Sequence, residues 1–265
     1  MVFESDNSLG GANAHPNEIL IEIADLEVTR RKKQFLSGLS LSVGREAVAV
    51  LGPNGVGKTT FLEVLVGLRP QTNGQVAFNS RSSGPAGPIQ HLARVNVGFV
   101  PQNDEPISGL TVSESITYAG WLKGLSGAAL RAAVSTTLEL SRCGDFAAQK
   151  ASKVSGGQFR RLLIAQGIVH NPDVLVLDEP TAALDPQEQI NLQRLLIDLK
   201  STCAVIFTTH NLRDLPGLAD RVVVMNEGRA VIFNSLREFC DLSSPSDEFS
   251  EATLQQAYER ALAQC

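Results

Sequence analysis

The stretch GPNGVGKTT at positions 52–60 constrains the fold of this chain more than any other part of the sequence. It follows the short apolar run AVAVLG and precedes FLEVLVGL, in which apolar residues recur with helical spacing. The first run is typical of a buried strand, because both faces of a strand inside a sheet are covered. A strand, a glycine-rich turn and a helix in this order predict a phosphate-binding loop within an α/β fold.

The residue types in this stretch suit nucleotide phosphates. Glycines let the backbone turn so that its N–H groups point at phosphate oxygens, and the helix N-terminus adds partial positive charge. We expect Lys58 to reach the β- and γ-phosphates and the Thr59 hydroxyl to bind Mg²⁺. A glycine-rich turn with a surface lysine is the alternative, which the flanking strand and helix disfavour. The predicted ATP-binding residues here are Gly52, Pro53, Asn54, Gly55, Val56, Gly57, Lys58, Thr59 and Thr60.

Two acidic residues end a second apolar run, VLVLDEP at 174–180. A strand of this kind brings Asp178 out at its carboxyl end, close to the phosphate-binding loop. Asp178 suits a Mg²⁺ ligand, and Glu179 could hold the attacking water and accept its proton. A helix cap or turn would explain the acids equally well if they stood alone, but the phosphate-binding loop favours the catalytic interpretation.

Polar side chains also follow two other predicted strands. Gln102 ends VGFVPQ and His210 ends VIFTTH. An isolated residue of this kind is most often a cap or a loop contact. In a parallel sheet, however, the carboxyl ends of the strands converge on the ligand crevice. Gln102 could then contact Mg²⁺ and the attacking water, and His210 could bond the γ-phosphate.

Strand and helix patterns alternate at both ends of the chain, whereas a block in the middle is helical throughout. Within that block, Thr111 with Glu114 three residues later predicts a capping box. The predicted fold is α/β, a P-loop core with an N-terminal antiparallel β subdomain and a helical subdomain inserted at about 103–155. The predicted divisions are a disordered leader at 1–17, a P-loop domain at 18–240 and a tail with an amphipathic helix at 241–265.

The stretch KVSGGQFRR at 153–161 contains no carboxylate, histidine or metal ligand. Its adjacent glycines are costly to order and pack little. Basic residues and an apolar-periodic run follow at once, which indicates that a helix begins there.

The chain resembles the ATPase domain of the ABC transporter family from about residue 19 to residue 239. The resemblance rests on six motifs that stand in the family's order: GPNGVGKTT, VPQ, VSGGQ, VLVLDEP, AALD and TTH. The resemblance implies an ATPase with ATP and Mg²⁺ as cofactors and Glu179 as catalytic base. It implies that Gln102 couples the site to the helical subdomain, that His210 contacts the γ-phosphate and that Asp185 communicates across a dimer. It further implies that two nucleotide domains, either identical or of two related chains, sandwich ATP in a head-to-tail dimer. In that dimer the ATP bound to one subunit contacts the signature segment of the other subunit, which here is Ser155, Gly156, Gly157 and Gln158.

The sequence departs from the family pattern at two places. Val154 replaces the usual leucine before the signature segment, a change between apolar packing residues that should matter little. The aromatic residue that commonly stacks on adenine is replaced by Arg30 or Arg31. Because a guanidinium plane can stack on a base, Arg31 is the predicted adenine contact. Phe35 is predicted to pack in the core.

The expected partner is a separate membrane permease, docked near Gln102 and residues 103–125. Tyr118 and Trp121 could contribute to that contact, although we predict that they pack in the core of the helical subdomain. The segment YAGWLKGLS at 118–126 and the tail resemble the efflux-type subfamily, which implies export. We expect a cytoplasmic location, peripheral on the inner face of the plasma membrane, because the chain shows no signal peptide and no apolar run long enough to span a membrane.

Two other classes of function share parts of this pattern. A soluble ABC-type ATPase acting on nucleic acid or ribosomes would show a basic face or an inserted coiled coil, and the net charge is −5. No nucleic acid partner is therefore expected. A P-loop kinase acting on a small acceptor would lack the signature segment. The four cysteines have no metal-ligand or redox spacing, which predicts free thiols in a reducing compartment, with Cys203 in the core.

Overall fold

The computed structural model describes residues 18–30, 33–78, 97–241 and 249–265. Its centre is a six-stranded sheet in the order β5-β6-β7-β3-β8-β9. Neighbours from β5 to β8 are parallel, and β9 returns antiparallel to β8 as a hairpin. The strands are β3 (Ala47–Leu51), β5 (Val97–Val100), β6 (Val174–Leu177), β7 (Ala204–Thr208), β8 (Arg221–Asn226) and β9 (Arg229–Phe233).

The register of the parallel strands brings the predicted site residues to one edge. Val100 pairs with Leu177, which pairs with Phe207, and Val50 of β3 pairs with Thr208. The residues that follow these strands therefore leave the sheet side by side. Every residue of β3, β6 and β7 is buried, because helices or the second sheet cover both faces of the central sheet.

A three-stranded antiparallel sheet in the order β2-β1-β4 covers one face. Its strands are β1 (Ile21–Arg30), β2 (Lys33–Val43) and β4 (Asn73–Phe78). Together with α1 (Lys58–Leu65) it encloses one apolar core. Strand β1 is continuous but irregular, because its register with β2 shifts next to Asp25, which has φ +47°.

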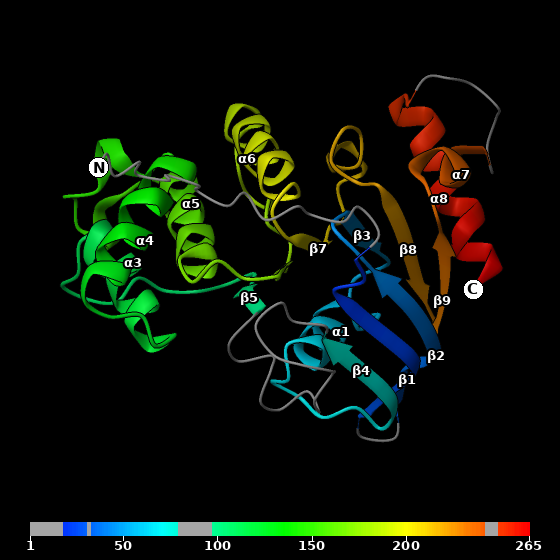
Figure 1. Cartoon of the computed structure of the whole chain (residues 1–265). Coiled ribbons are helices and arrows are strands. Elements are labelled where there is room, and N and C mark those ends of the chain that lie inside the picture. The colour runs from blue at the N-terminus through cyan, green and yellow to red at the C-terminus, as the bar shows by residue number, and fades with distance from the viewer. Residues whose placement is uncertain (1–17, 31–32, 79–96, 242–248) are drawn as a thin grey trace, which may run out of the picture.

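Helices cover the opposite face and form a second core with the central sheet. Figure 1 shows α6, α7 and α8 on the side of the sheet away from β1, β2 and β4. The helices that contribute to this second core are α5 (Gly156–Ile168), α6 (Pro186–Leu199), α7 (Leu236–Asp241) and α8 (Glu251–Gln264). Pro186 occupies the first turn of α6, where its missing N–H costs no hydrogen bond. Cys203 is buried in this core, and all four cysteines are free.

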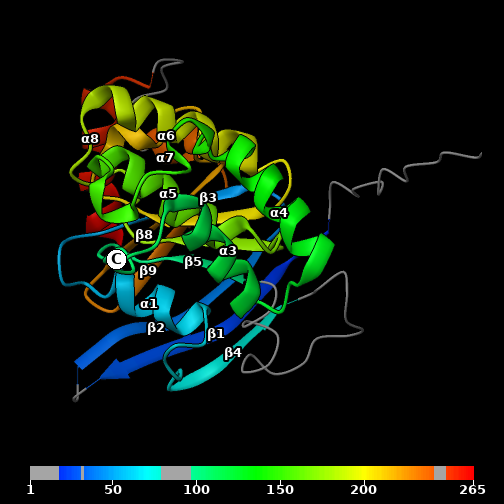
Figure 2. The ribbon, with the colours of Figure 1, turned by 90° about the vertical axis from the view of Figure 1, so that its left-hand side faces the viewer.

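Three helices pack together at one end of the molecule and are called the helical lobe below: α3 (Val112–Leu122), α4 (Gly127–Leu140) and α5. Figure 2, viewed from that end, shows them in front of the sheet. The capping box predicted at Thr111 and Glu114 is present at the start of α3. Short 3₁₀ turns at Gly144–Phe146 and Ala151–Lys153 connect α4 to α5. Because α5 also packs on the central sheet, it joins the lobe to the site edge.

The prediction that Tyr118 and Trp121 pack in the core of the lobe is wrong. Tyr118 is 41% exposed and Trp121 is 59% exposed, and their rings stack on each other with centroids 6.0 Å apart. Helical spacing places both on the outer side of α3, and the lobe core on the inner side is filled instead by Val112 and Ile116.

Candidate functional site

The predicted phosphate-binding loop lies between the end of β3 and the start of α1. Its backbone enters the left-handed region at Gly55, with φ +76°, and at Gly57, with φ +116°. Only glycine adopts such angles readily, which explains why the loop contains these residues. Lys58 follows at the first position of α1, so the chain turn, the helix N-terminus and an ammonium group converge.

Lys58 is 6% exposed, and its Nζ donates hydrogen bonds to the carbonyls of Gly52 at 2.8 Å and Pro53 at 3.3 Å. Burial lowers the pKa of Lys58, while the nearby carboxylates of Glu179 and Asp178 oppose that shift. The ammonium is thus held over the loop by weak carbonyl partners that an anion could replace.

Asp178 emerges from the end of β6 and contacts the phosphate loop directly. Its Oδ2 accepts a hydrogen bond of 2.7 Å from the Thr59 hydroxyl, and its Oδ1 accepts one of 2.5 Å from the Thr208 hydroxyl. The side chain is only 2% exposed. Two of the three residues predicted to contact Mg²⁺, Thr59 and Asp178, therefore lie together and present oxygen atoms, which are the ligands that Mg²⁺ prefers. The third, Gln102, directs its amide nitrogen to Glu179 instead.

Glu179 lies next to the other two predicted catalytic residues. Its Oε2 accepts a 3.0 Å hydrogen bond from Gln102 Nε2 and lies 3.1 Å from His210 Nδ1. The Glu179 backbone has φ +46°, a left-handed conformation that is strained for a residue other than glycine. The structure therefore brings Gln102, Glu179 and His210, from three different strand ends, to one point.

An open cleft of about 580 Å³ joins these groups to the phosphate loop. It is lined by Phe35, Asn54, Gly55, Gly57, Lys58, Thr59, Thr60, Gln102, Glu179, Ala182 and His210. Phe35 packs against the core, as predicted, but it is only half-buried and also lines the cleft. A Cβ on Gly57 would lie 2.7 Å from the Phe35 ring, so the loop passes directly against it. Arg31, the predicted adenine contact, lies outside the described residues.

The signature segment stands apart from this cleft, at the exposed N-terminus of α5. Ser155 caps the helix by accepting from Gln158 N at 3.2 Å, and Gln158 Oε1 accepts from Ser155 N at 2.9 Å. Gly157 packs tightly, since a Cβ there would lie 2.7 Å from the Glu188 side chain. Asp185 similarly caps α6 by accepting from Glu188 N at 3.0 Å. None of the residues 155–158 lines the cleft within the same chain.

Sequence patterns did not single out two buried charged residues beside the cleft. Arg160, in α5, is 7% exposed and donates hydrogen bonds to the backbone at the ends of β5 and β6. Asp214, which follows His210, accepts from the Thr181 hydroxyl at 2.6 Å and from the Thr209 hydroxyl at 2.5 Å. Arg160 and Asp214 make these contacts mainly with distant parts of the chain, so local residue spacing does not predict them. The basic pair that follows SGGQ is the one sequence feature that points to Arg160.

The ABC transporter family matches residues 36–182, which is more than half of the chain. The chain belongs to the ABC transporter family. An uncharacterized ABC transporter ATP-binding protein of Bacillus subtilis is 34% identical over 83% of this chain and 72% of its own length. The Nod factor export ATP-binding protein I of Burkholderia orbicola is 38% identical over 80% of this chain and 69% of its own length.

Solved ABC cassettes share the fold. A nucleotide-free ATP-binding cassette from an ABC transporter superposes with a TM-score of 0.74 at 20% identity, covering 90% of this chain and 98% of that one. A dimeric cassette in a post-hydrolysis state with ADP and phosphate gives a TM-score of 0.71 at 24% identity, covering 82% and 99%. The predicted fold class is thereby confirmed. This ABC protein is the ATP-binding subunit of a transporter and an ATPase. Among its described residues no helix has the length and apolar character needed to cross a membrane.

Proposed function

We propose that this ABC subunit hydrolyses Mg²⁺-ATP within a head-to-tail dimer of the chain and so drives a separate membrane permease. The observation that carries the proposal is the convergence of Gln102, Glu179 and His210 beside the Thr59–Asp178 pair at the mouth of the phosphate loop. Phosphoryl transfer to water needs mainly positioning and charge stabilisation, and this set of residues supplies both.

On binding ATP, Lys58 would exchange its weak carbonyl partners for phosphate oxygens, and the loop N–H groups would bond to the same phosphates. Thr59 and Asp178 would hold Mg²⁺, which neutralises phosphate charge when bound. Phe35 is the described aromatic side chain in the cleft, so we propose that its ring packs against the base in place of the usual aromatic residue. Arg31 remains a proposed second base contact.

Glu179 would accept the proton of the attacking water, since its Oε2 already lies within hydrogen-bond distance of two polar side chains. Gln102 Nε2 donates to that oxygen and restrains the carboxylate. His210, whose side chain is more than half exposed, would turn from Glu179 to the γ-phosphate once a nucleotide is bound. The strained Glu179 backbone fits a residue whose orientation is fixed for chemistry.

The N-terminus of α5 would receive the γ-phosphate of ATP bound to the other subunit. Ser155 and Gly156 are exposed at this helix end, and together with the N–H of Gly157 they would form an anion site that does not line the nucleotide cleft of its own chain. The chain thus contains both halves of a nucleotide site, and two copies in head-to-tail arrangement would complete two sites. Asp185, at the start of the neighbouring helix α6, would lie at the same interface.

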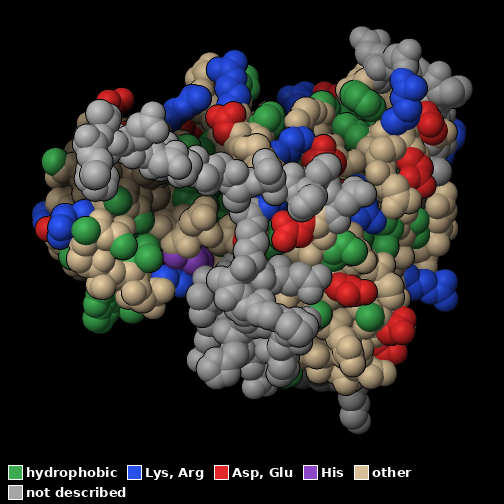
Figure 3. All heavy atoms as spheres, in the orientation of Figure 1, with side chains coloured by type: hydrophobic (Ala, Val, Ile, Leu, Met, Phe, Trp, Pro, Cys, Tyr) green, Lys and Arg blue, Asp and Glu red, His purple; other side chains and the backbone are tan. Residues whose placement is uncertain are grey.

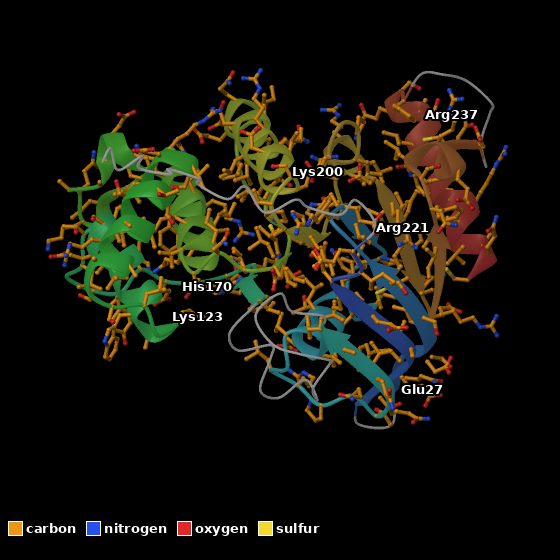
Figure 4. The ribbon with its side chains drawn as sticks, viewed as in Figure 1. Glu27, Lys123, His170, Lys200, Arg221 and Arg237 are labelled. Carbon is orange, nitrogen blue, oxygen red and sulfur yellow. The ribbon has the colours of Figure 1, made fainter. Side chains whose placement is uncertain are left out.

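The permease would dock beside the helical lobe. A cavity of about 450 Å³ lies between α3, the end of α5 and β5. Its rim exposes the apolar side chains of Leu68 and Leu122, and Trp121 is exposed on the same helix. Lys123 and His170 also line it, on the side of the lobe nearest β5 (Figure 4). Figure 3 shows a histidine beside a basic side chain in this recess.

Several observations support this docking site, and the relatives support a direction of transport. Exposed apolar side chains gathered around a hollow are typical of an interaction site. Pro101 lines the cavity and Gln102 follows it, so a partner seated there would lie one residue from the catalytic cluster. Export is supported by the relatives named for Nod factor export. Attachment to the permease would place the subunit at the inner face of the plasma membrane.

Substituting Ser155 by arginine tests the dimeric site. Ser155→Arg is expected to bind ATP as tightly as the wild type, because its own cleft is untouched, but to lose at least about 100-fold in hydrolysis. ATP binding is measured by equilibrium titration and turnover by phosphate release. Ser152→Arg, exposed on the 3₁₀ turn before α5, introduces the same bulk and charge and is the matched control. Full turnover by Ser155→Arg would show that the signature segment does not take part.

A further inference from the structure

Arg160 makes an unusual set of hydrogen bonds at the centre of the site. It lies five residues after Ser155 on α5, and its guanidinium is almost completely buried. All of its nitrogens donate to backbone carbonyl oxygens: Nε to Pro180 at 2.8 Å, Nη1 to Pro101 at 2.8 Å and Gln102 at 3.3 Å, and Nη2 to Asp178 at 2.7 Å and Glu179 at 2.8 Å.

These contacts compensate a buried charge without a carboxylate partner. A guanidinium carries five N–H donors in a planar fork, and here five carbonyl dipoles receive them. Burial lowers the pKa of Arg160 to about 10, so the side chain remains a cation at neutral pH. A lysine could not reach both loops at once, since its donors spread from a single nitrogen.

The same guanidinium holds the backbone of the proposed catalytic base. Glu179 adopts φ +46°, which a residue other than glycine keeps only when its surroundings enforce it. Its N–H is fixed by the Thr208 hydroxyl at 2.8 Å, and its carbonyl is fixed by Arg160. Arg160 also bonds the carbonyl of Gln102, whose side chain restrains the Glu179 carboxylate.

We propose that Arg160 is a positioning residue that couples the signature helix to the catalytic base. A phosphate that arrives at Ser155 from the other subunit shifts α5, and the guanidinium transmits this shift to the backbone of Gln102 and Glu179. One subunit thereby aligns its own base only after it has engaged its partner's ATP. This inference rests on the proposed function, in which Glu179 is the base.

Arg160→Gln tests the coupling, with Arg160→Lys as a second variant that keeps the charge. Both are expected to lower kcat by about 30-fold or more, while the Kd for ATP stays within about threefold. The control is Arg131→Gln, which removes the same charge at an exposed position on the lobe helix α4, away from the cleft and the signature segment. It should change kcat and Kd by less than about threefold. Thermal melting of the full chain verifies that each variant is folded.

A double variant separates positioning from a purely structural role. If Arg160 acts through Glu179, then adding Arg160→Gln to Glu179→Gln should lower the residual turnover no further. Wild-type kcat in a folded Arg160→Gln chain, parallel loss of ATP affinity, or an additive loss in the double variant would each overturn the proposal. Wild-type turnover by Glu179→Gln alone would instead refute the proposed function, so the two failures are distinguishable.

Discussion

Glu179→Gln is expected to lower steady-state ATP hydrolysis by about 100- to 10,000-fold, the range typical for loss of a general base. The substitution is nearly isosteric, and the amide can still pair with Gln102 and His210, but it cannot take a proton from water. ATP affinity should change by less than about threefold, because the phosphate loop is unaltered. Phosphate release and equilibrium ATP titration on the same preparation measure the two quantities.

The matched control for this variant is Glu139→Gln, which makes the same chemical change at an exposed position on α4. It should retain the turnover of the wild type. If Glu179→Gln hydrolyses ATP as fast as the wild type does, then Glu179 is not the base. A parallel loss of ATP affinity would show that Glu179 acts in binding.

Lys58→Met is expected to weaken ATP binding by roughly 100-fold or more, because each charge-assisted hydrogen bond to phosphate is worth about 1.5–3 kcal/mol. Methionine retains the unbranched stem of the buried lysine, so the loss should come from the ammonium group. Direct titration with ATP measures the effect without depending on turnover.

Arg194→Met, at an exposed position on α6, removes one positive charge away from the cleft and should bind ATP as the wild type does. Comparing the two variants separates the specific contact from the change in net charge. ATP affinity in Lys58→Met equal to that of the control would contradict the assignment of the phosphate site.

Much of the site followed from the sequence because its parts are local. GPNGVGKTT and VLVLDEP each contain a strand and the residues that follow it, so the type of element and its functional end are read together. Since parallel strands end at one edge, Gln102, Glu179 and His210 could be expected to meet, and their side chains do. The capping boxes at Thr111 and Ser155 are equally local.

What escaped prediction depends on contacts between distant segments. Arg160 bonds carbonyls about 20 and 60 residues away, and no spacing rule gives the direction of a guanidinium on a helix that packs on two sides. Asp214 joins the loop after β6 to the loop after β7 in the same way. Trp121 was assigned to the wrong face because apolar character predicts burial, whereas this residue is exposed at the proposed docking surface.

The central claim is that each nucleotide site is completed by the signature segment of a second chain. The most direct test is the solution mass of Glu179→Gln with saturating Mg²⁺-ATP, measured by light scattering with and without the added change Ser155→Arg. We expect a dimer with ATP, a monomer without it, and an ATP-bound monomer when Ser155→Arg is present. A Glu179→Gln chain that stays monomeric with ATP bound, or a dimer that Ser155→Arg leaves intact, would contradict it.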